Sequence, residues 1–317
     1  MIRPEIVSSV RAKIERASGP LPVPKLAYWL CGTPRTGSNL LRFALRKSKC
    51  GHAAEGYHKY ANQDFGWGYD ESDFTRYTRQ MITAQTTEKS GIFGLKIFWE
   101  QFQYYLSQCD HQSISFGETL SPHEKVALFF PDLNYVFIRR RNKIRQAISM
   151  VKAKQRSAFV SPTRQKGTTP PSGRLRYSSK MITYYLDLFI AQEMLWESFF
   201  NQGDLNPKMV WYEDFETQYE AQVKGVTKFL GREPKRIPTP RSEKQADELS
   251  ETWYQQYLTE NPWIADPDDS ANLIANRHIK LLRAADGELV VSSAIWWLRF
   301  KRLITNPRQY IKRLLVK

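Results

Sequence analysis

The chain has 317 residues, of which 41% are hydrophobic and 13% aromatic, and it carries a formal net charge of +15 at pH 7. The apolar content excludes general disorder and is enough for one large core, although the length also permits two domains. The basic balance favours an anionic partner, and composition does not distinguish a nucleic acid, an acidic membrane surface and a multiply charged nucleotide.

The cysteines and the N-terminus predict a cytoplasmic protein. Cys31, Cys50 and Cys109 form no CxxC pair and are odd in number, which disfavours a disulfide framework and a structural zinc site. Residues 1–20 hold no continuous apolar stretch of the kind found in signal peptides. No window of about 18 apolar residues predicts a transmembrane helix. We therefore expect reduced thiols and no membrane span.

The first organised unit is a strand, a loop and a helix, which follow a predicted N-terminal helical segment at residues 1–25. Residues 26–31, LAYWLC, predict a short buried strand. The sequence GTPRTGSN then supplies turn residues, and LLRFALRKS has helical spacing.

Further strands and helices alternate along the chain. We predict strands at 91–99, 134–140 and 209–212, and helices from about 143, at about 179–201 and at 216–230, where Gly231 is a stop signal. Residues 157–178 are rich in Ser, Thr, Pro, Gly and Arg and predict a loop, with a substrate lid as one interpretation. This alternation predicts an α/β fold with a P-loop-like, mainly parallel central sheet flanked by helices, whose ligands bind beyond the carboxyl ends of the strands.

The loop after the first strand is a candidate phosphate site. A helix start leaves about four backbone N–H groups unpaired and carries a partial positive charge, so it attracts phosphate. Gly37 allows close approach, and Arg35 adds a fixed charge. The candidate residues are Pro34, Arg35, Thr36, Gly37, Ser38 and Asn39. The alternative is an ordinary helix with Ser38 as N-cap, and the GxxxxGK[ST] pattern of common ATPases is absent.

A second candidate anion site follows the strand NYVFIRR. Arg141 opens the next loop, Asn142 comes after it, and Ser149 lies eight residues after Arg141. One phosphate touches both Arg141 and Ser149 only if the loop folds back beside the helix. A solvated basic turn is the alternative, although arginines directly after a buried strand favour the ligand cleft.

These two segments together resemble the sulfotransferases that use 3′-phosphoadenosine-5′-phosphosulfate (PAPS). The form TPRTGSNLL resembles the bacterial Stf-zero family, typified by trehalose 2-sulfotransferase. Five further blocks look like family blocks in the expected order: GHAAEGY at 51–57, GLKIFWEQ at 94–101, RRRNKIRQAISM at 139–150, VWYEDF at 210–215 and QADELSETWYQQY at 245–257. The resemblance covers roughly residues 26–260, and it divides the chain into an N-terminal segment 1–25, a sulfotransferase domain 26–260 and a basic, helical C-terminal extension 261–317.

The resemblance implies in-line transfer of a sulfuryl group from PAPS to a carbohydrate hydroxyl, without a metal. Residues 34–39 would hold the 5′-phosphosulfate, and Arg141 and Ser149 the 3′-phosphate. Transfer of this kind depends on positioning and charge stabilisation more than on covalent chemistry.

The resemblance also assigns roles around the acceptor. Glu55 matches the family's catalytic glutamate, although Ala53 and Ala54 stand where a proline often precedes it, which leaves the register open by one position. We expect Arg35 and Lys96 to stabilise the developing charge, and Trp99 and Gln101 to line the acceptor pocket with Glu55. The alternatives are a surface carboxylate for Glu55, a strand-edge lysine for Lys96 and a core residue for Trp99.

The last 22 residues, Trp296–Lys317, contain seven Lys or Arg and no acidic residue. Apolar residues at helical spacing beside basic ones suit a helix on a membrane surface, and a terminal helix packed on the core is the alternative. Membrane contact would favour a glycolipid or a lipid-linked glycan as acceptor and a peripheral location at the inner membrane face.

Three other functions stay open. Charge alone also suits a nucleic-acid-binding protein, but the sequence has no zinc-finger or RNP motif, so we predict no nucleic-acid partner. A P-loop kinase would need a Walker lysine. A membrane scaffold without activity is the third alternative, and the sequence leaves a homodimer open.

Overall fold

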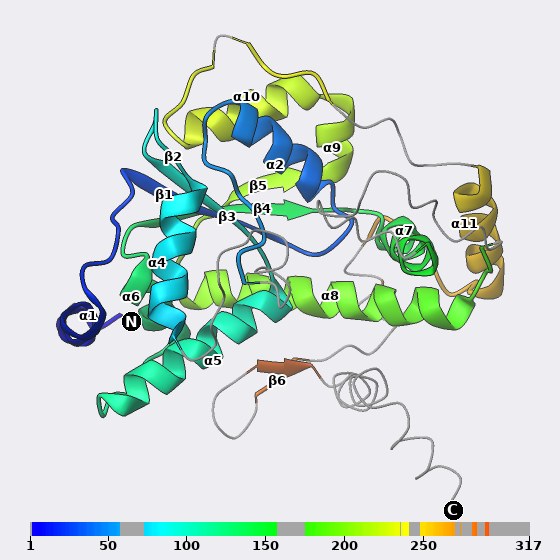
Figure 1. The fold of residues 1–317 in the computed structure, drawn as a ribbon. Coiled ribbons are helices and arrows are strands. Elements are labelled where there is room, and N and C mark those ends of the chain that lie inside the picture. Colours follow the sequence, from blue (N-terminus) through cyan, green and yellow to red (C-terminus); the bar gives the residue numbers. More distant parts are fainter. Residues whose placement is uncertain are drawn as a thin grey trace, which may run out of the picture.

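The computed structural model describes residues 2–57, 73–156, 175–234, 236–240, 248–269, 273, 281–283 and 289–291. Its centre is a five-stranded sheet in the order β2-β3-β1-β4-β5 (Figure 1). The strands are β1 (Leu26–Gly32), β2 (Thr86–Thr87), β3 (Ile92–Phe98), β4 (Leu133–Arg139) and β5 (Lys208–Trp211). Within this sheet β1, β3, β4 and β5 are parallel, and the short β2 is antiparallel to β3. The sheet confirms the predicted α/β class.

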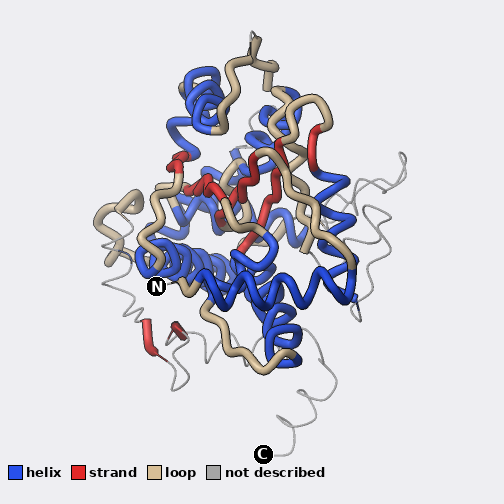
Figure 2. The backbone as a smooth tube through the Cα atoms, turned by 90° about the vertical axis from the view of Figure 1, so that its left-hand side faces the viewer, coloured by secondary structure: helices blue, strands red, loops and turns tan. Residues whose placement is uncertain are grey.

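Helices cover both faces of the sheet (Figures 1 and 2). They are α1 (Pro4–Ser18), α2 (Ser38–Lys47), α4 (Phe74–Gln85), α5 (Trp99–Ser115), α6 (Pro122–Phe129), α7 (Lys143–Gln155), α8 (Ser179–Gln202), α9 (Tyr212–Thr217), α10 (Tyr219–Phe229) and α11 (Glu248–Glu260). Helices α2, α9 and α10 lie on one face, and α4, α5, α6 and α8 lie on the other.

The central strand β1 explains this layering, because successive side chains of a strand point to opposite faces. Trp29 packs edge-on against Phe102 and Tyr105 of α5, in the larger apolar cluster. Tyr28 and Leu30 belong to the cluster on the side of α2, α9 and α10. A third cluster joins α7, the first half of α8 and α11. All of β1 after its first residue is buried, as the apolar run LAYWLC predicts.

Most predicted boundaries agree with the structure within two residues, and one helix differs. The predicted helix 216–230 is two helices, α9 and α10, because Gln218 leaves the helical region with φ −126° and ψ 42°. Helix α9 begins earlier than predicted, directly after β5, so the acidic residues Glu213 and Asp214 lie in its first turn. Gly231 has φ +65° just after the end of α10, as the stop signal requires.

The ends of the chain test the sequence predictions in part. Residues 1–25 do contain a helix, and Val7, Val10 and Ile14 of α1 belong to the main core. In the predicted helical extension the described part includes two short antiparallel strands, β6 (Leu281–Arg283) and β7 (Leu289–Val291). They were not predicted from the sequence because three residues show no periodicity. Trp296–Lys317 and most of the predicted loop, residues 157–174, lie outside the described residues. The three-part division of the chain stays a prediction.

Cys31, Cys50 and Cys109 are free and buried. Among the described helices, none is both long enough and apolar enough to cross a membrane.

Candidate active site

The loop between β1 and α2 is held in one shape by its own residues and by α7. Arg35 and Gly37 have positive φ values of 69° and 78°. The hydroxyl of Thr36 donates to the carbonyl of Thr33 at 2.9 Å, and Gln146 Nε2 donates to Thr33 Oγ1 at 2.8 Å and to the carbonyl of Pro34 at 2.6 Å. A Cβ atom on residue 37 would lie 2.8 Å from Cδ2 of Tyr212, so this position requires glycine for both its φ and its space.

The helix start after this loop has the features of an anion site. The N-cap of α2 is Gly37, without a side-chain cap, so the alternative of a helix capped by Ser38 is wrong: Ser38 is the first helical residue. The backbone N–H groups of Gly37, Ser38 and Asn39 find no hydrogen-bond acceptor in the described chain. Unpaired N–H groups at the positive end of a helix bind phosphate or sulfate oxygens well.

The two predicted anion segments meet through Arg35 and Ser149. Arg35 Nε donates to Ser149 Oγ at 2.9 Å, although 114 residues separate them. Arg140 reinforces the junction: Nη1 lies 3.4 Å from the carbonyl oxygen of Arg35, and the guanidinium lies over the ring of Tyr212 at 4.4 Å. The β1–α2 loop and the start of α7 therefore border one polar region at the carboxyl ends of β1 and β4.

Arg141 pairs with a carboxylate in the structure, and its binding of one phosphate together with Ser149 stays a prediction. Its guanidinium makes two hydrogen bonds to the carboxylate of Asp214, at 2.7 and 2.9 Å, and lies 4.9 Å from the ring centre of Trp211. Its backbone N–H donates to the carboxylate of Glu213. The early start of α9 causes this arrangement, because it brings two carboxylates to the loop after β4.

A second polar group lies beside the loop and consists of Glu55, Lys96, Gln101 and Asn39. Lys96 Nζ lies 2.5 Å from Glu55 Oε1 and donates to Asn39 Oδ1 at 2.6 Å. Gln101 Nε2 donates to Glu55 Oε2 at 2.9 Å. Glu55 therefore contacts both Lys96, predicted to stabilise charge, and Gln101, predicted for the acceptor pocket. Asn39, predicted for the donor, connects Lys96 to the loop.

The backbone around β3 explains why these side chains converge. Ala54 forms a parallel bridge with Leu95, and the N–H of Lys96 donates to the carbonyl of Ala54 at 3.1 Å. Glu55 therefore leaves the edge of the sheet directly beside Lys96. The Lys96 side chain is 2% exposed and Glu55 is 29% exposed. Burial lowers the pKa of Lys96, and the charge of Glu55 opposes that shift.

Trp99, predicted for the acceptor pocket, contributes to the core. Its ring is half-buried and packs edge-on against Trp196 at 5.1 Å and Phe102 at 5.3 Å. Its Nε1 atom is buried and has no hydrogen-bond partner among the described residues. The core alternative therefore describes much of this side chain, and contact with an acceptor stays a prediction.

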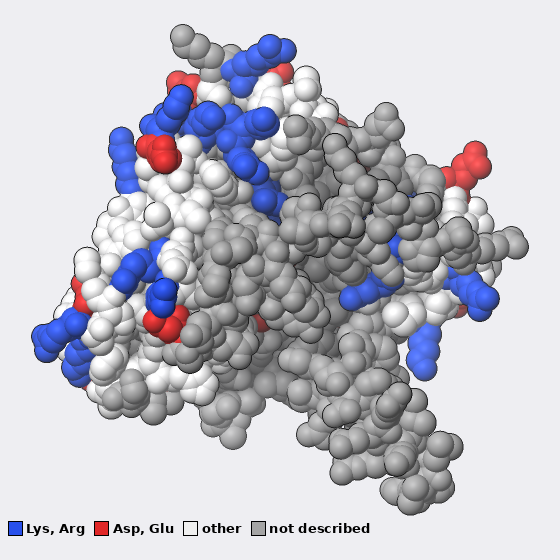
Figure 3. All heavy atoms as spheres, viewed as in Figure 1, with Lys and Arg blue, Asp and Glu red and all other residues white. Residues whose placement is uncertain are grey.

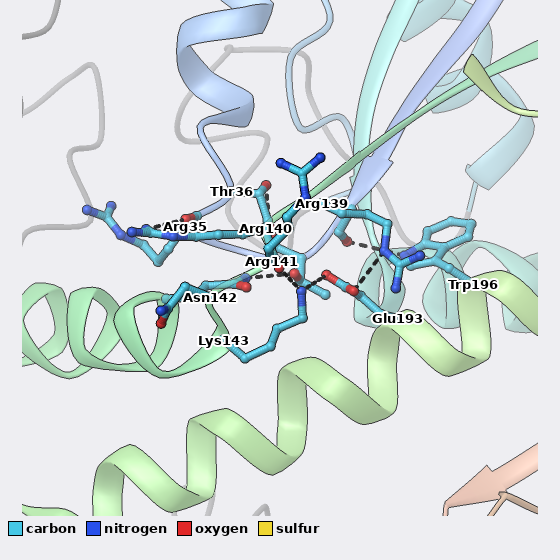
Figure 4. Close-up of polar contacts among 12 residues, drawn as sticks. Arg35, Thr36, Arg139, Arg140, Arg141, Asn142, Lys143, Glu193 and Trp196 are labelled. Carbon is cyan, nitrogen blue, oxygen red and sulfur yellow. Dashed lines mark hydrogen bonds and ion pairs between the residues drawn. The ribbon is translucent and has the colours of Figure 1, made fainter. Parts of the chain in front are cut away.

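A buried ion-pair network supports the strand ends from below (Figure 4). Glu193 of α8 pairs with Lys143 at 2.9 Å and with Arg139 at 2.9 Å, and the Glu193 and Lys143 side chains are 3% and 1% exposed. Lys143 also donates to the carbonyl of Arg140, and Trp196 Nε1 donates to the carbonyl of Gly32 at 3.2 Å. The network therefore fixes α8 to the ends of β1 and β4, where the anion loops begin.

The region around these loops holds more positive than negative charge. Burial lowers the pKa of Arg35, Arg42, Lys96 and Arg140. The carboxylates that act on this group are mainly those of Glu55 and Glu213. Partly buried cations in excess favour a bound anion, because its charge would offset their desolvation.

Comparison with protein families decides the identity of this arrangement. The model of the Stf0 sulphotransferases matches residues 27–260. The chain belongs to the Stf0 sulphotransferase family. This confirms the resemblance inferred from the sequence motifs, and it makes the chain a sulfotransferase.

Individual proteins similar to this sulfotransferase are distant in sequence. A protein named trehalose 2-sulfotransferase from Mycobacterium tuberculosis is 22% identical over 266 residues, which are 76% of this chain and 97% of that protein. One of the same name from Mycolicibacterium smegmatis is 26% identical over 182 residues, 56% of this chain and 65% of that protein. A crystal structure of a sulfotransferase from Alicyclobacillus acidocaldarius covers 82% of this chain and 98% of its own, at 15% identity and a TM-score of 0.40.

Several residues that contact the candidate site were not predicted from the sequence. Gln146 holds the β1–α2 loop, Arg140 lies on Tyr212, and Arg42 is partly buried with its Nε donating to the carbonyl of His52 at 3.3 Å. Helical spacing could have found two of them, since Arg42 lies three residues after Asn39 and Gln146 three before Ser149. No sequence signal separates Arg140 from its two arginine neighbours. Among the described residues, no cluster of three His, Cys, Asp or Glu could hold a metal ion.

Proposed function

We propose that this protein transfers the sulfuryl group of PAPS to a hydroxyl of a sugar. The observation that carries the proposal is the connection made by Asn39. It lies at the helix start with the unpaired N–H groups, and its side chain accepts a hydrogen bond from Lys96, which is paired with Glu55. An anion site and a candidate base are therefore neighbours. The acceptor class rests on the two relatives named for trehalose.

The donor would bind along the loops at the carboxyl ends of β1 and β4. Residues 34–39 suit its 5′-phosphosulfate, because the unpaired N–H groups and the positive φ values of Arg35 and Gly37 make an anion-binding concavity. Arg141 and Ser149 are assigned the 3′-phosphate by the resemblance. Arg141 would then exchange the carboxylate of Asp214 for that phosphate. Both are anions that accept two hydrogen bonds from a guanidinium.

The transfer step balances without further reactants. The acceptor oxygen forms a bond to sulfur while the bond between sulfur and the bridging oxygen breaks, and the electron pair leaves on the phosphate of adenosine 3′,5′-bisphosphate. The hydroxyl proton passes to Glu55, whose side chain is 29% exposed. Arg35 and Lys96 stabilise the charge on the leaving oxygen, and a well-placed donor of this kind contributes about 3–4 kcal/mol.

Labelled PAPS tests the proposal directly. The protein is incubated with the donor in the presence of EDTA and a panel of acceptors: trehalose, other sugars and a glycolipid extract. Binding of adenosine 3′,5′-bisphosphate is measured separately by thermal shift. We expect stabilisation by the bisphosphate and transfer to at least one acceptor. The absence of both sulfuryl transfer and bisphosphate binding would overturn the proposal. If a glycolipid is the acceptor, the same assay can be used to test membrane contact through Trp296–Lys317. Membrane contact, a homodimer and a cytoplasmic location stay predictions.

A further inference from the structure

A basic cluster lies at the end of α2, next to the loop that carries Glu55. Arg42 and Arg46 are four residues apart on α2, so they share one face of the helix. The chain then reverses: the N–H of Lys49 donates to the carbonyl of Arg46 at 3.1 Å, and Arg42 Nε donates to the carbonyl of His52 at 3.3 Å. The basic cluster consists of Arg42, Arg46, Lys49 and His52. Lys and Arg side chains gather in this area of the surface (Figure 3).

The positive charges of the cluster act on His52. Burial and the charges of Arg46, Arg42 and Lys49 together lower the pKa of the His52 imidazole. In the described part of the chain, no carboxylate lies within ion-pair distance of Arg42, Arg46 or Lys49. Glu55 is the acid whose charge acts on Arg42, and it is already paired with Lys96. Among the residues that the structure describes, the cluster therefore has more positive charge than its neighbouring carboxylates offset.

The end of a helix does not by itself account for this cluster. Cations in the last turn offset the negative end of the helix dipole, which explains Arg46 and Lys47. Arg42 lies one turn earlier, is partly buried at a cost that lowers its pKa, and bonds to the Glu55 loop rather than to α2. A bound anion would offset the desolvation of the Arg42 guanidinium.

The cluster lies within reach of an acceptor bound at Glu55. His52 precedes Glu55 by three residues, which span at most about 10 Å of extended chain. The loop between them is fixed, because the N–H of His52 donates to the carbonyl of Gln85 at 3.0 Å and the N–H of Ala54 donates to Gln85 Oε1 at 2.6 Å. A sugar with its hydroxyl at Glu55 could place a charged substituent on the cluster.

We propose that the acceptor of this sulfotransferase is an anionic sugar, whose phosphate or carboxylate group binds Arg42 and Arg46 beside Lys49 and His52. This inference rests on the proposed function and names its substrate class. The anionic group distinguishes such an acceptor from a neutral disaccharide, and it is the same chemistry whether the sugar is free or a lipid headgroup.

Calorimetry on the protein saturated with adenosine 3′,5′-bisphosphate tests the inference, because the donor site is then filled. The probes are matched pairs: trehalose 6-phosphate with trehalose, and glucose 6-phosphate and glucuronate with glucose. Vesicles of phosphatidylcholine with and without phosphatidylinositol separate a lipid headgroup from a free sugar. We expect the anionic member of a pair to bind at least tenfold more tightly.

Variants assign that preference to the cluster. Arg42→Gln and Arg46→Gln should each reduce it severalfold and together abolish it, whereas Arg42→Lys should keep most of it. Lys47→Gln is the matched control, since it removes an exposed charge from the same helix. The ammonium of Lys47 lies over the ring of Phe43 and not in the cluster. The exposed Arg46 gives a second variant that does not disturb the interior.

The outcomes separate the two proposals. Equal binding of charged and neutral sugars, no sugar binding at all, or a preference unchanged in the double variant would each overturn the anionic acceptor. The proposed function would survive those results if the bisphosphate binds and labelled sulfate is transferred. If the bisphosphate does not bind, the proposed function fails, and the sugar titrations still report on the cluster.

Discussion

Lys96 and Glu55 form a close ion pair at the edge of β3, 2.5 Å apart, with the lysine almost fully buried. Replacing Glu55 by Gln removes the group that we assign to accept the proton. We expect kcat to fall by about 10²–10⁴-fold, the usual contribution of a general base. Adenosine 3′,5′-bisphosphate binding should persist. Glu100→Gln, an exposed acid on the adjoining helix, is the control, and a Glu55→Gln enzyme within tenfold of the original rate would contradict the assignment.

The buried Lys96 predicts an early alkaline limb in the rate. Burial holds its pKa below the ordinary 10.5, so its positive charge is lost at a lower pH than in an exposed lysine. We expect kcat/KM to decline with rising pH below 10.5, and Lys96→Arg to lack this decline because arginine stays charged. Between the folded and unfolded pKa values the unfolded chain binds more protons, so stability should rise with pH in that window. A decline identical in both enzymes would assign it to another group.

The β1–α2 loop makes Gly37 and Gly117 a matched pair. Both have φ +78°, but a Cβ on Gly37 would strike Tyr212, whereas one on Gly117 would meet nothing within 4 Å. Each alanine costs about 1–2 kcal/mol of stability through its backbone conformation. We expect Gly37→Ala also to lose at least tenfold in bisphosphate affinity, measured by calorimetry, and Gly117→Ala to keep it. Equal affinities would show that the loop shape is not needed for the donor.

The ion-pair network under the loops offers a buried and an exposed carboxylate on one helix. Glu193 is 3% exposed and pairs with two cations, while Glu197 is 43% exposed and pairs with Arg139. Glu193→Gln removes the carboxylate partner of the buried Lys143, while Arg139 keeps Glu197, and should cost about 3–5 kcal/mol of unfolding free energy. Glu197→Gln should cost less than about 1 kcal/mol. Urea unfolding followed by fluorescence compares the two variants, and similar midpoints would contradict the importance of burial.

Asp214 competes for Arg141 if that arginine binds the 3′-phosphate. Both side chains are 38% exposed, so the pair is worth at most about 1 kcal/mol. Asp214→Asn should therefore strengthen binding of adenosine 3′,5′-bisphosphate by no more than about fivefold. Binding of adenosine 5′-monophosphate, which lacks the 3′-phosphate, should not change. Weaker bisphosphate binding in the variant would instead make Asp214 a positioning residue for Arg141.

Much of the fold and the list of site segments followed from local sequence. The run LAYWLC predicts β1 because every side chain in it is apolar, and turn residues before a helical pattern predict the loop and α2. Strands β2, β6 and β7 are too short to show a period, and the division between α9 and α10 depends on the single conformation of Gln218.

The amino-acid sequence determined which segments carry charge, where strands end and which family the chain resembles, because these are properties of neighbouring residues. Only the tertiary structure decided that Arg35 meets Ser149, that Arg141 turns to Asp214, and that Glu193 anchors the loops from α8. Such pairs join residues more than 50 positions apart, and a short-range sequence pattern cannot predict them. Their partners are chosen by which strand ends lie side by side in the sheet, and that choice is made when the whole core packs.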